Sequence, residues 1–331
     1  MSDPNPDSHQ TEATSEPNTL GGFIDNIRDV IRNTITGQDH VINEVIAALL
    51  AGGHVLLEGK PGLGKTHLVN ALALSFGGNA GRIQFTPDLM PSDVTGFRLF
   101  DMQSQTFQLR KGPVFTNLLL ADEINRAPAK TQAALLEVMQ ERQVTIDGET
   151  IRLNPPFMTL ATQNPIEHEG TYPLPEAQLD RFLMKILIDY PSADDEAAIV
   201  TRAASDEPGN ASHGQQIVCG PDQIVAAQRA TEAVQAVPEV VAYAVALARA
   251  TREARTVSLG AGTRGAISLV RAAKAYAVMD DRGYTTPDDI KRAAMPVLRH
   301  RIQITPEVAI SGQQVDDVLA AIIESVPAPR Q

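Results

Sequence analysis

The stretch 59–66 reads Gly-Lys-Pro-Gly-Leu-Gly-Lys-Thr and has the spacing of a loop that binds phosphate. Its glycines let the backbone curl so that consecutive N–H groups point at phosphate oxygens, and the helix expected after it adds its positive N-terminal end. Lys65 can reach the terminal phosphates, and the Thr66 hydroxyl can hold Mg²⁺. The pattern predicts a nucleotide site formed by Gly59, Lys60, Pro61, Gly62, Leu63, Gly64, Lys65, Thr66 and His67.

Two acids, Asp122 and Glu123, follow a second apolar run at 117–121. Such a run is typical of a buried parallel strand, and ligands gather at the carboxyl ends of these strands. Asp122 is expected to join the Mg²⁺ shell with Thr66, and Glu123 to polarise the attacking water as general base. The pair could instead only cap a helix. With the phosphate-binding pattern upstream, it favours an enzyme that hydrolyses ATP.

Composition and charge narrow the class of protein. The 331 residues are 43% hydrophobic and 21% charged, which is typical of a soluble protein with room for two domains. The net charge of −12 argues against non-specific attraction to nucleic acid or to an anionic membrane. One cysteine and seven histidines without metal-ligand spacing leave Mg²⁺ as the only metal expected. Without a secretion signal or a membrane-spanning run, the sequence predicts a cytoplasmic protein.

The chain divides into three parts. Residues 1–19 are polar and predict a disordered tail. Residues 20–190 alternate helix and strand signals, as in an α/β fold with an open parallel sheet. Alanine-rich helices dominate 191–331, where Thr286 and Asp289 have the spacing of a capping box. The strands of the sheet are expected at 54–58, 82–86, 117–121, 157–162 and 184–189.

Two β-hairpins are expected to interrupt the α/β part. Alternating β-formers surround Asp147-Gly148 at 144–153 and predict a type I′ turn. A second hairpin is expected at 97–110, with a polar tip at 102–105. The residues alone favour surface hairpins that only cover the core.

Three more residues are candidates for contact with the phosphates. Asn164 follows the strand at 157–162 and could orient the attacking water, or only cap the next turn. Arg181 could be an arginine finger, although an exposed arginine is usually a solvated charge. Arg264 opens a helix of the last part and could reach over to the phosphates, or could lie on the helix surface.

These features together resemble the AAA+ ATPases and, within them, the MoxR family. The resemblance is carried by the long stretch 121–144, which begins Ala-Asp-Glu-Ile-Asn-Arg-Ala-Pro, and by 161–165, 169–182 and 297–301. It covers about residues 20 to 325 and implies an AAA+ core with a parallel five-stranded sheet, followed by a small all-α lid domain. The hairpins then resemble the helix-2 insert and the pre-sensor insert of this clade, which tend to face a central pore.

The resemblance also assigns roles to single residues. Lys65 with Thr66, and Asp122 with Glu123, resemble the Walker A and Walker B pairs. Asn164 resembles sensor 1, Arg181 an arginine finger that reaches a neighbouring subunit, and Arg264 sensor 2. Gly37 and Gln38 resemble the segment that borders the adenine. Arg126 could form either a subunit contact or a plain salt bridge. The sensor 2 stretch departs from the common Gly-x-Ser-Pro-Arg pattern, because it reads Gly-Ala-Gly-Thr-Arg at 260–264.

The implied function is that of a ring, most often a hexamer, which binds ATP between subunits. MoxR-like ATPases remodel client protein complexes as chaperones, often with a partner that carries a von Willebrand factor A domain. A DNA-dependent motor is disfavoured because the hairpin tip at 147–149 is acidic, so no nucleic acid is expected. A metal-chelatase motor subunit fits the stretches 125–128 and 173–177 less well. A nucleotide-gated scaffold without turnover is disfavoured by Glu123, Asn164 and Arg181.

Overall fold

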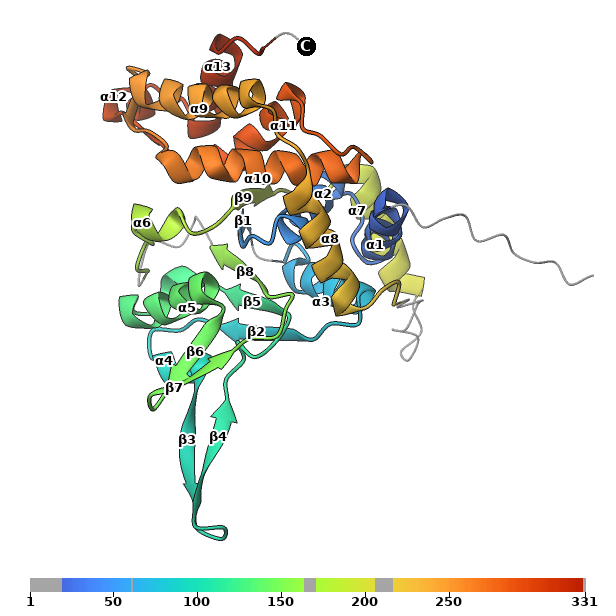
Figure 1. Cartoon of the computed structure of the whole chain (residues 1–331), viewed down its shortest axis with the longest axis vertical. Helices are drawn as coiled ribbons and strands as arrows, with labels where there is room; N and C mark the ends of the chain where they lie inside the picture. Colours follow the sequence, from blue (N-terminus) through green and yellow to red (C-terminus); the bar gives the residue numbers. More distant parts are fainter. Residues whose placement is uncertain (1–19, 61, 164–170, 206–216, 330–331) are drawn as a thin grey trace, which may run out of the picture.

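The computed structural model describes residues 20–60, 62–163, 171–205 and 217–329, so that the predicted tail, Pro61 and Asn164 lie outside it. A five-stranded sheet with the order β2-β5-β8-β1-β9 forms its centre, and every pairing in it is parallel (Figure 1). The phosphate-binding pattern follows the inner strand β1. The strands are β1 (Val55–Gly59), β2 (Ala80–Gln84), β5 (Leu118–Asp122), β8 (Met158–Gln163) and β9 (Met184–Ile188).

The five predicted strands are confirmed to within two residues at each end. The inner strands β5 and β8 are buried along almost their whole length, as their apolar runs predict. The largest difference is at β2, which begins at Ala80 rather than at residue 82. This strand lies at the edge of the sheet, and Ile83 is its one buried residue, so its start leaves no apolar signal in the sequence.

Helices cover both faces of the sheet, and the alternation of side chains along each strand sets which core a residue joins. Leu57 and Leu118 face the layer of α1 (Leu20–Thr34), α2 (Asp39–Leu50) and α3 (Lys65–Ser75). Leu56 and Leu119 face the opposite layer, which contains α5 (Ala129–Glu141). The shorter helices of this part are α4 (Pro91–Thr95), η1 (Ile124–Arg126) and α6 (Glu176–Leu179), and α7 (Ala193–Ser205) follows the sheet.

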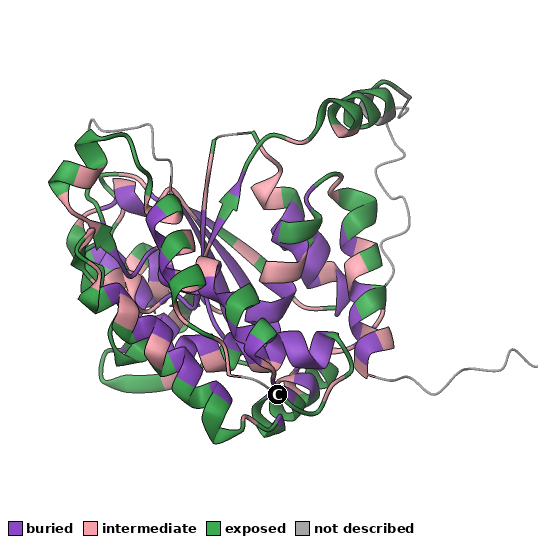
Figure 2. Ribbon diagram, turned by 90° about the horizontal axis from the view of Figure 1, so that it is seen from above, coloured by how far each residue is buried: buried purple, intermediate pink, exposed green. Residues whose placement is uncertain are grey.

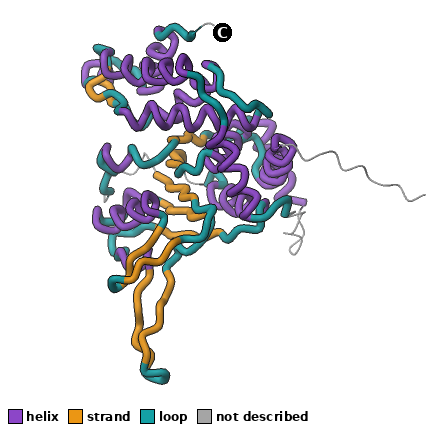
Figure 3. The backbone as a smooth tube through the Cα atoms, in the orientation of Figure 1, coloured by secondary structure: helices purple, strands orange, loops and turns teal. Residues whose placement is uncertain are grey.

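Both hairpins are present. The first pairs β3 (Gly96–Asp101) with β4 (Thr106–Lys111) and projects away from the body of the molecule (Figures 1 and 3). The second pairs β6 (Gln143–Ile146) with β7 (Glu149–Arg152). Its turn residues Asp147 and Gly148 have φ values of 50° and 82°, which confirms the left-handed pair that a type I′ turn needs.

The last part of the chain is mainly helical, as expected, but it is not all-α. A short antiparallel pair joins β10 (Val257–Leu259) to β11 (Gln303–Ile304). Strands of three and two residues are too short to show a period of two, so the sequence pattern could not reveal them. The helices are α8 (Pro221–Ala233), α9 (Pro238–Glu253), α10 (Thr263–Met279), α11 (Pro287–Leu298), α12 (Pro306–Ile310) and α13 (Val315–Ser325).

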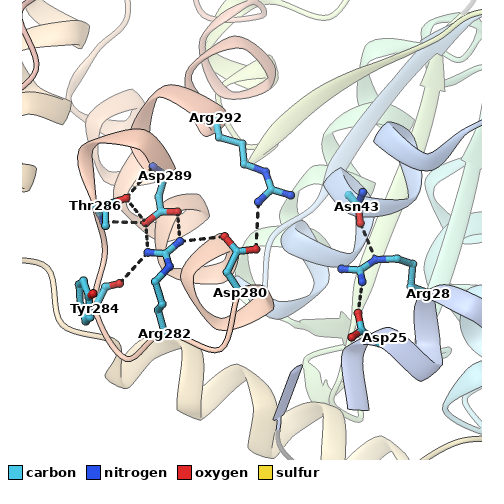
Figure 4. Close-up of polar contacts among 9 residues, drawn as sticks. All are labelled: Asp25, Arg28, Asn43, Asp280, Arg282, Tyr284, Thr286, Asp289 and Arg292. Atoms are coloured by element: carbon cyan, nitrogen blue, oxygen red, sulfur yellow. Dashed lines mark hydrogen bonds and ion pairs between the residues drawn. The ribbon is translucent and has the colours of Figure 1, made fainter. Parts of the chain in front are cut away.

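The helical part packs directly on the α/β part through one continuous cluster of buried residues, which extends from Ile24 in α1 to Leu319 in α13. Figure 2 shows buried residues in the strands and in the helices around them, and α10 lies between the sheet and the outer helices in Figure 1. Arg282 in the turn before α11 forms a two-pronged ion pair with Asp289, which also closes the predicted capping box with Thr286 (Figure 4).

Candidate functional site

The phosphate-binding loop has the conformation that its glycines were expected to allow. Gly62 and Gly64 have φ values of 84° and 77°, in the left-handed region that other residues avoid. Gly59 has no room for a side chain, because a Cβ there would lie 2.4 Å from the carbonyl oxygen of Ile188. The loop passes at once into α3, whose first residue is Lys65, so the positive end of that helix faces the loop.

The loop lines a pocket of about 400 Å³ at the carboxyl ends of the strands. The predicted acids Asp122 and Glu123 line the same pocket, so the structure brings together the two motifs that are 56 residues or more apart in the chain. Four polar residues from neighbouring strands complete the wall: Arg82, Gln84, Thr162 and Gln163.

Thr162 connects the two acids. Its hydroxyl donates a hydrogen bond of 2.6 Å to Oδ1 of Asp122 and accepts one of 2.8 Å from the backbone N–H of Glu123. The other oxygen of Asp122 accepts from Arg82 at 2.7 Å, and the Glu123 carboxylate accepts from Arg126 at 2.9 Å. The salt-bridge alternative for Arg126 is therefore realised within the chain, and a contact with another subunit stays a prediction.

Lys65 is half-buried in the pocket, and its Nζ donates a hydrogen bond of 2.6 Å to the carbonyl oxygen of Gly59. Burial lowers the pKa of its ammonium group, and the nearby carboxylates of Asp122, Glu123 and Glu58 oppose that shift. A phosphate oxygen is a stronger acceptor for this ammonium group than a neutral carbonyl. The loop thus holds Lys65 close to where phosphates would bind.

A second hollow of about 410 Å³ adjoins the loop and suits the base of a nucleotide. Gln38 lines it, is buried, and donates through Nε2 to the carbonyl oxygen of Asp189 at 2.8 Å. Its Oε1 is buried without a hydrogen-bond partner among the described residues, and the role of Gln38 beside the adenine stays a prediction. Gly37 (φ 75°) lies beside Asp195 of α7, where a Cβ would come within 2.6 Å of that carboxylate. The remaining residues that line this hollow include Ile35, Thr36, Leu63, His67, Pro191 and Ile199.

Oxygen donors for a magnesium ion are also present. Thr66 and Asp122 line the phosphate-loop pocket together, and hydroxyl and carboxylate oxygens are the ligands that Mg²⁺ prefers. The residues present therefore fit ATP with Mg²⁺.

Arg181 and Arg264 lie in a different place. Both line a pocket of about 510 Å³ at the amino ends of β1 and β9, together with Gly53 and His54. Since β1 runs from this pocket to the phosphate loop, and a strand rises about 3.3 Å per residue, the two pockets are roughly 20 Å apart. An arginine side chain does not span that distance. The described residues of one chain therefore do not bring these arginines to their own phosphate loop.

The sequence reading missed three residues that organise these pockets: Thr162, Arg82 and Arg301. Arg301 is buried and donates to the carbonyl oxygens of Phe182 at 2.6 Å and Leu183 at 3.1 Å, and to the carboxylate of Asp180 at 2.8 Å. It therefore holds the segment that carries Arg181. Its place in the family-like stretch 297–301 is the one signal that could have drawn attention to it.

Comparison with known proteins agrees with this architecture. The family described as "ATPase family associated with various cellular activities (AAA)" matches residues 54–184, and the AAA lid domain matches residues 249–322. Fold and site thus define a member of the AAA ATPases. An uncharacterized protein of Bacillus subtilis, YeaC, is 44% identical over 312 residues, which cover 94% of this chain and 95% of that protein.

Chaperone MoxR1 of Mycobacterium tuberculosis is 41% identical over 313 residues, which cover 91% of this chain and 81% of that protein. A crystal structure of a protein assigned as an ATPase, from Cytophaga hutchinsonii, has a TM-score of 0.86 and 40% identity, and the match covers 94% of this chain and 96% of that one. The chain belongs to the MoxR family of AAA ATPases. No helix in the described parts of the chain is both long and apolar enough to cross a bilayer.

Proposed function

We propose that this chain hydrolyses ATP in the pocket formed by the phosphate loop, Asp122 and Glu123. The observation that supports this proposal most directly is that Lys65, Thr66 and both acids line one pocket beside a base-sized hollow. Bound Mg²⁺ would neutralise phosphate charge and orient the terminal phosphates. Glu123 would accept the proton of the attacking water, and Lys65 would stabilise charge on the phosphate oxygens.

Hydrolysis would take place between subunits of a ring. Arg181 and Arg264 lie roughly 20 Å from the phosphate loop of their own chain, by the rise of β1, and this separation supports a role for them at the nucleotide of a neighbouring subunit. A contact that joins one end of a subunit to the opposite end of the next is heterologous and closes into a cyclic assembly. Family resemblance favours six subunits, and the relative named as a chaperone is consistent with the cytoplasmic location expected from the sequence. Asn164 would orient the attacking water in this scheme.

The ring would remodel client protein complexes, together with a partner that carries a von Willebrand factor A domain. The relative named Chaperone MoxR1 supports this role. The projecting hairpin β3–β4 also supports it, because Phe97, Met102 and Phe107 are 45%, 81% and 66% exposed and could hold an apolar client segment. The tip at 147–149 is acidic, and Glu149 is ion-paired with Arg98, so a hairpin that tracks DNA is disfavoured.

Glu123→Gln tests the proposal. The variant should bind ATP and release phosphate at a rate near background, because the amide cannot accept the proton of water. Pull-down of this variant with and without ATP, followed by mass spectrometry, should recover a von Willebrand factor A protein or an enzyme complex. Wild-type turnover by Glu123→Gln, or no turnover by the wild-type protein, would refute the ATPase. Recovery of nucleic acid with replication proteins would favour the DNA motor.

A further inference from the structure

The pocket that holds Arg181 and Arg264 has an unusual charge. Among the described residues that line it are five arginines and a single carboxylate, Asp180; the arginines are Arg142, Arg181, Arg264, Arg271 and Arg301. His54 also lines the pocket but adds no charge near neutral pH, because burial lowers its pKa to about 4. The pocket therefore carries a large excess of positive charge.

The single carboxylate is already engaged. Asp180 accepts from Nε of Arg301 at 2.8 Å, and its other oxygen lies 3.7 Å from Nη1 of Arg264. Arg301 is buried and directs its remaining donors to carbonyl oxygens and to the Ser268 hydroxyl of its own chain. Asp180 and Arg301 thus balance each other, and the positive charge of the other four arginines remains for a ligand.

Arg142 and Arg271, to which no sequence motif assigns a role, converge on one point of this pocket. Arg142 donates to the carbonyl oxygen of Gly52 at 2.8 Å, and Arg271 donates to that of Ala51 at 2.6 Å. A Cβ placed on Gly52 would lie 3.3 Å from Nη2 of Arg142 and 4.0 Å from Nη2 of Arg271. Two like charges are therefore held side by side at the C-terminal end of α2.

The close approach of the two guanidinium groups is electrostatically unfavourable. Burial and the neighbouring Arg142 lower the pKa of Arg271, although Glu232 on α8 attracts it. Arg142 also adopts a φ of 53°, in the left-handed region where glycine is the residue without strain. Each guanidinium group has five N–H donors and uses one in the hydrogen bond to the carbonyl oxygen of Gly52 or Ala51, so the others can donate to an anion.

We propose that this pocket binds the phosphate groups of a nucleoside triphosphate and that Arg142 and Arg271 contact them beside Arg181 and Arg264. A triphosphate matches in charge the excess of four guanidinium groups over carboxylates in the pocket lining, and guanidinium groups bind phosphate oxygens in a forked geometry. The source of the triphosphate rests on the proposed function: it would be the ATP held by the phosphate loop of a second copy of this chain. A free polyphosphate is the other source of the same chemistry.

Binding of inorganic tripolyphosphate to the full-length protein tests the pocket directly. Titration calorimetry is performed in a Lys65→Ala background, which weakens the phosphate loop. Arg142→Gln and Arg271→Gln keep an N–H donor for the carbonyl groups of α2 but lose the charge. Each should weaken tripolyphosphate binding by about tenfold or more, as expected for a lost hydrogen bond to a charged group. Arg249→Gln is the matched control, because Arg249 is an exposed arginine paired with Glu253 on α9.

A mixing experiment identifies the source of the phosphates. Subunits with Arg271→Gln keep their phosphate loop, and subunits with Lys65→Ala keep their arginines. If the arginines act on a neighbour, the mixture should hydrolyse ATP faster than either variant alone. No recovery, with tripolyphosphate binding still dependent on Arg142 and Arg271, would assign the pocket to a free polyphosphate and reject the neighbour.

Equal tripolyphosphate binding by wild-type, Arg142→Gln and Arg271→Gln pockets would overturn the proposal and leave these arginines as links between α2 and its neighbours. Melting temperatures show whether each variant is folded, and Arg142→Met or Arg271→Met, which also removes the charge, replaces any variant that is not. A wild-type protein that binds tripolyphosphate through these arginines but hydrolyses no ATP would refute the ATPase function and not the pocket.

Discussion

Replacement of Thr162 by valine tests how the two acids of the proposed catalytic pocket are positioned. Valine keeps the shape of threonine, and Thr162 is only 1% exposed, so the main change is the loss of the hydroxyl. The variant loses the 2.6 Å hydrogen bond to the Asp122 carboxylate and leaves the N–H of Glu123 without its acceptor at 2.8 Å. A hydrogen bond to a charged group contributes about 1.5–3 kcal/mol.

If that free energy is lost in the transition state, the rate falls by roughly 10- to 150-fold, since each 1.36 kcal/mol is a factor of ten. Phosphate release at saturating ATP measures kcat, and a fluorescent ADP analogue measures nucleotide binding separately. We expect kcat to fall while the affinity for ADP changes little, because the phosphate loop itself is intact. Thr162→Ser, which keeps the hydroxyl, should retain most of the activity.

Three results would contradict this reasoning. Wild-type turnover by Thr162→Val would show that the hydroxyl does not hold the acids in their working positions. An equal loss by Thr162→Ser would show that the methyl group and its packing matter rather than the hydrogen bonds. A large drop in ADP affinity would mean that the substitution disturbs the phosphate loop as well.

Three further changes test the fold. Gly59→Ala places a Cβ 2.4 Å from the carbonyl oxygen of Ile188 and should destabilise the protein by about 1–3 kcal/mol in urea unfolding; an unchanged midpoint would contradict the loop geometry. Burial raises the pKa of Glu44 from 4.5 to about 7, so the free energy of unfolding falls as pH rises between these values. Glu44→Gln should therefore be as stable as the wild type at pH 4.5 and more stable at pH 8, by up to about 3 kcal/mol in the free energy of unfolding. Equal stability of the two proteins at pH 8 would exclude the shift. Arg282→Ala and Asp289→Ala should be non-additive by about 0.5–3 kcal/mol in a double-mutant cycle on unfolding, because their side chains pair at 2.6 and 2.7 Å; additive losses would show that the pair is not coupled.

Sequence reasoning succeeded where the signal is local. The phosphate loop and the capping box of Thr286 with Asp289 depend on residues within eight positions of one another, and backbone geometry fixes what such spacings form. The inner strands were found because burial on both faces demands apolar runs. Asp122 and Glu123 line the pocket of the phosphate loop, as expected, because parallel strands end at one edge of the sheet.

Sequence reasoning failed where contacts depend on which elements become neighbours. Thr162 meets Asp122 because β8 pairs with β5, and Arg82 meets it because β2 pairs with β5 on the other side. Neither pairing can be read from spacing along the chain. The arginine pocket draws on residues as distant as Arg142 and Arg301, and each of them alone has the signature of a solvated charge.

Strand β1 connects the arginine pocket to the phosphate loop of the same chain. It begins beside Gly53 in the arginine pocket, ends at Gly59 in the phosphate loop, and is paired along its length with β8 and β9. A buried strand paired on both sides moves as part of its sheet, so Gly53 and the phosphate loop of one chain keep a fixed separation. Arg301, by contrast, belongs to the helical part and holds the Arg181 segment through its carbonyl groups. A tilt of the helical part would therefore displace Arg181 and leave the phosphate loop in place. In the proposed ring, such a tilt would change the contact of Arg181 with the nucleotide of the next subunit.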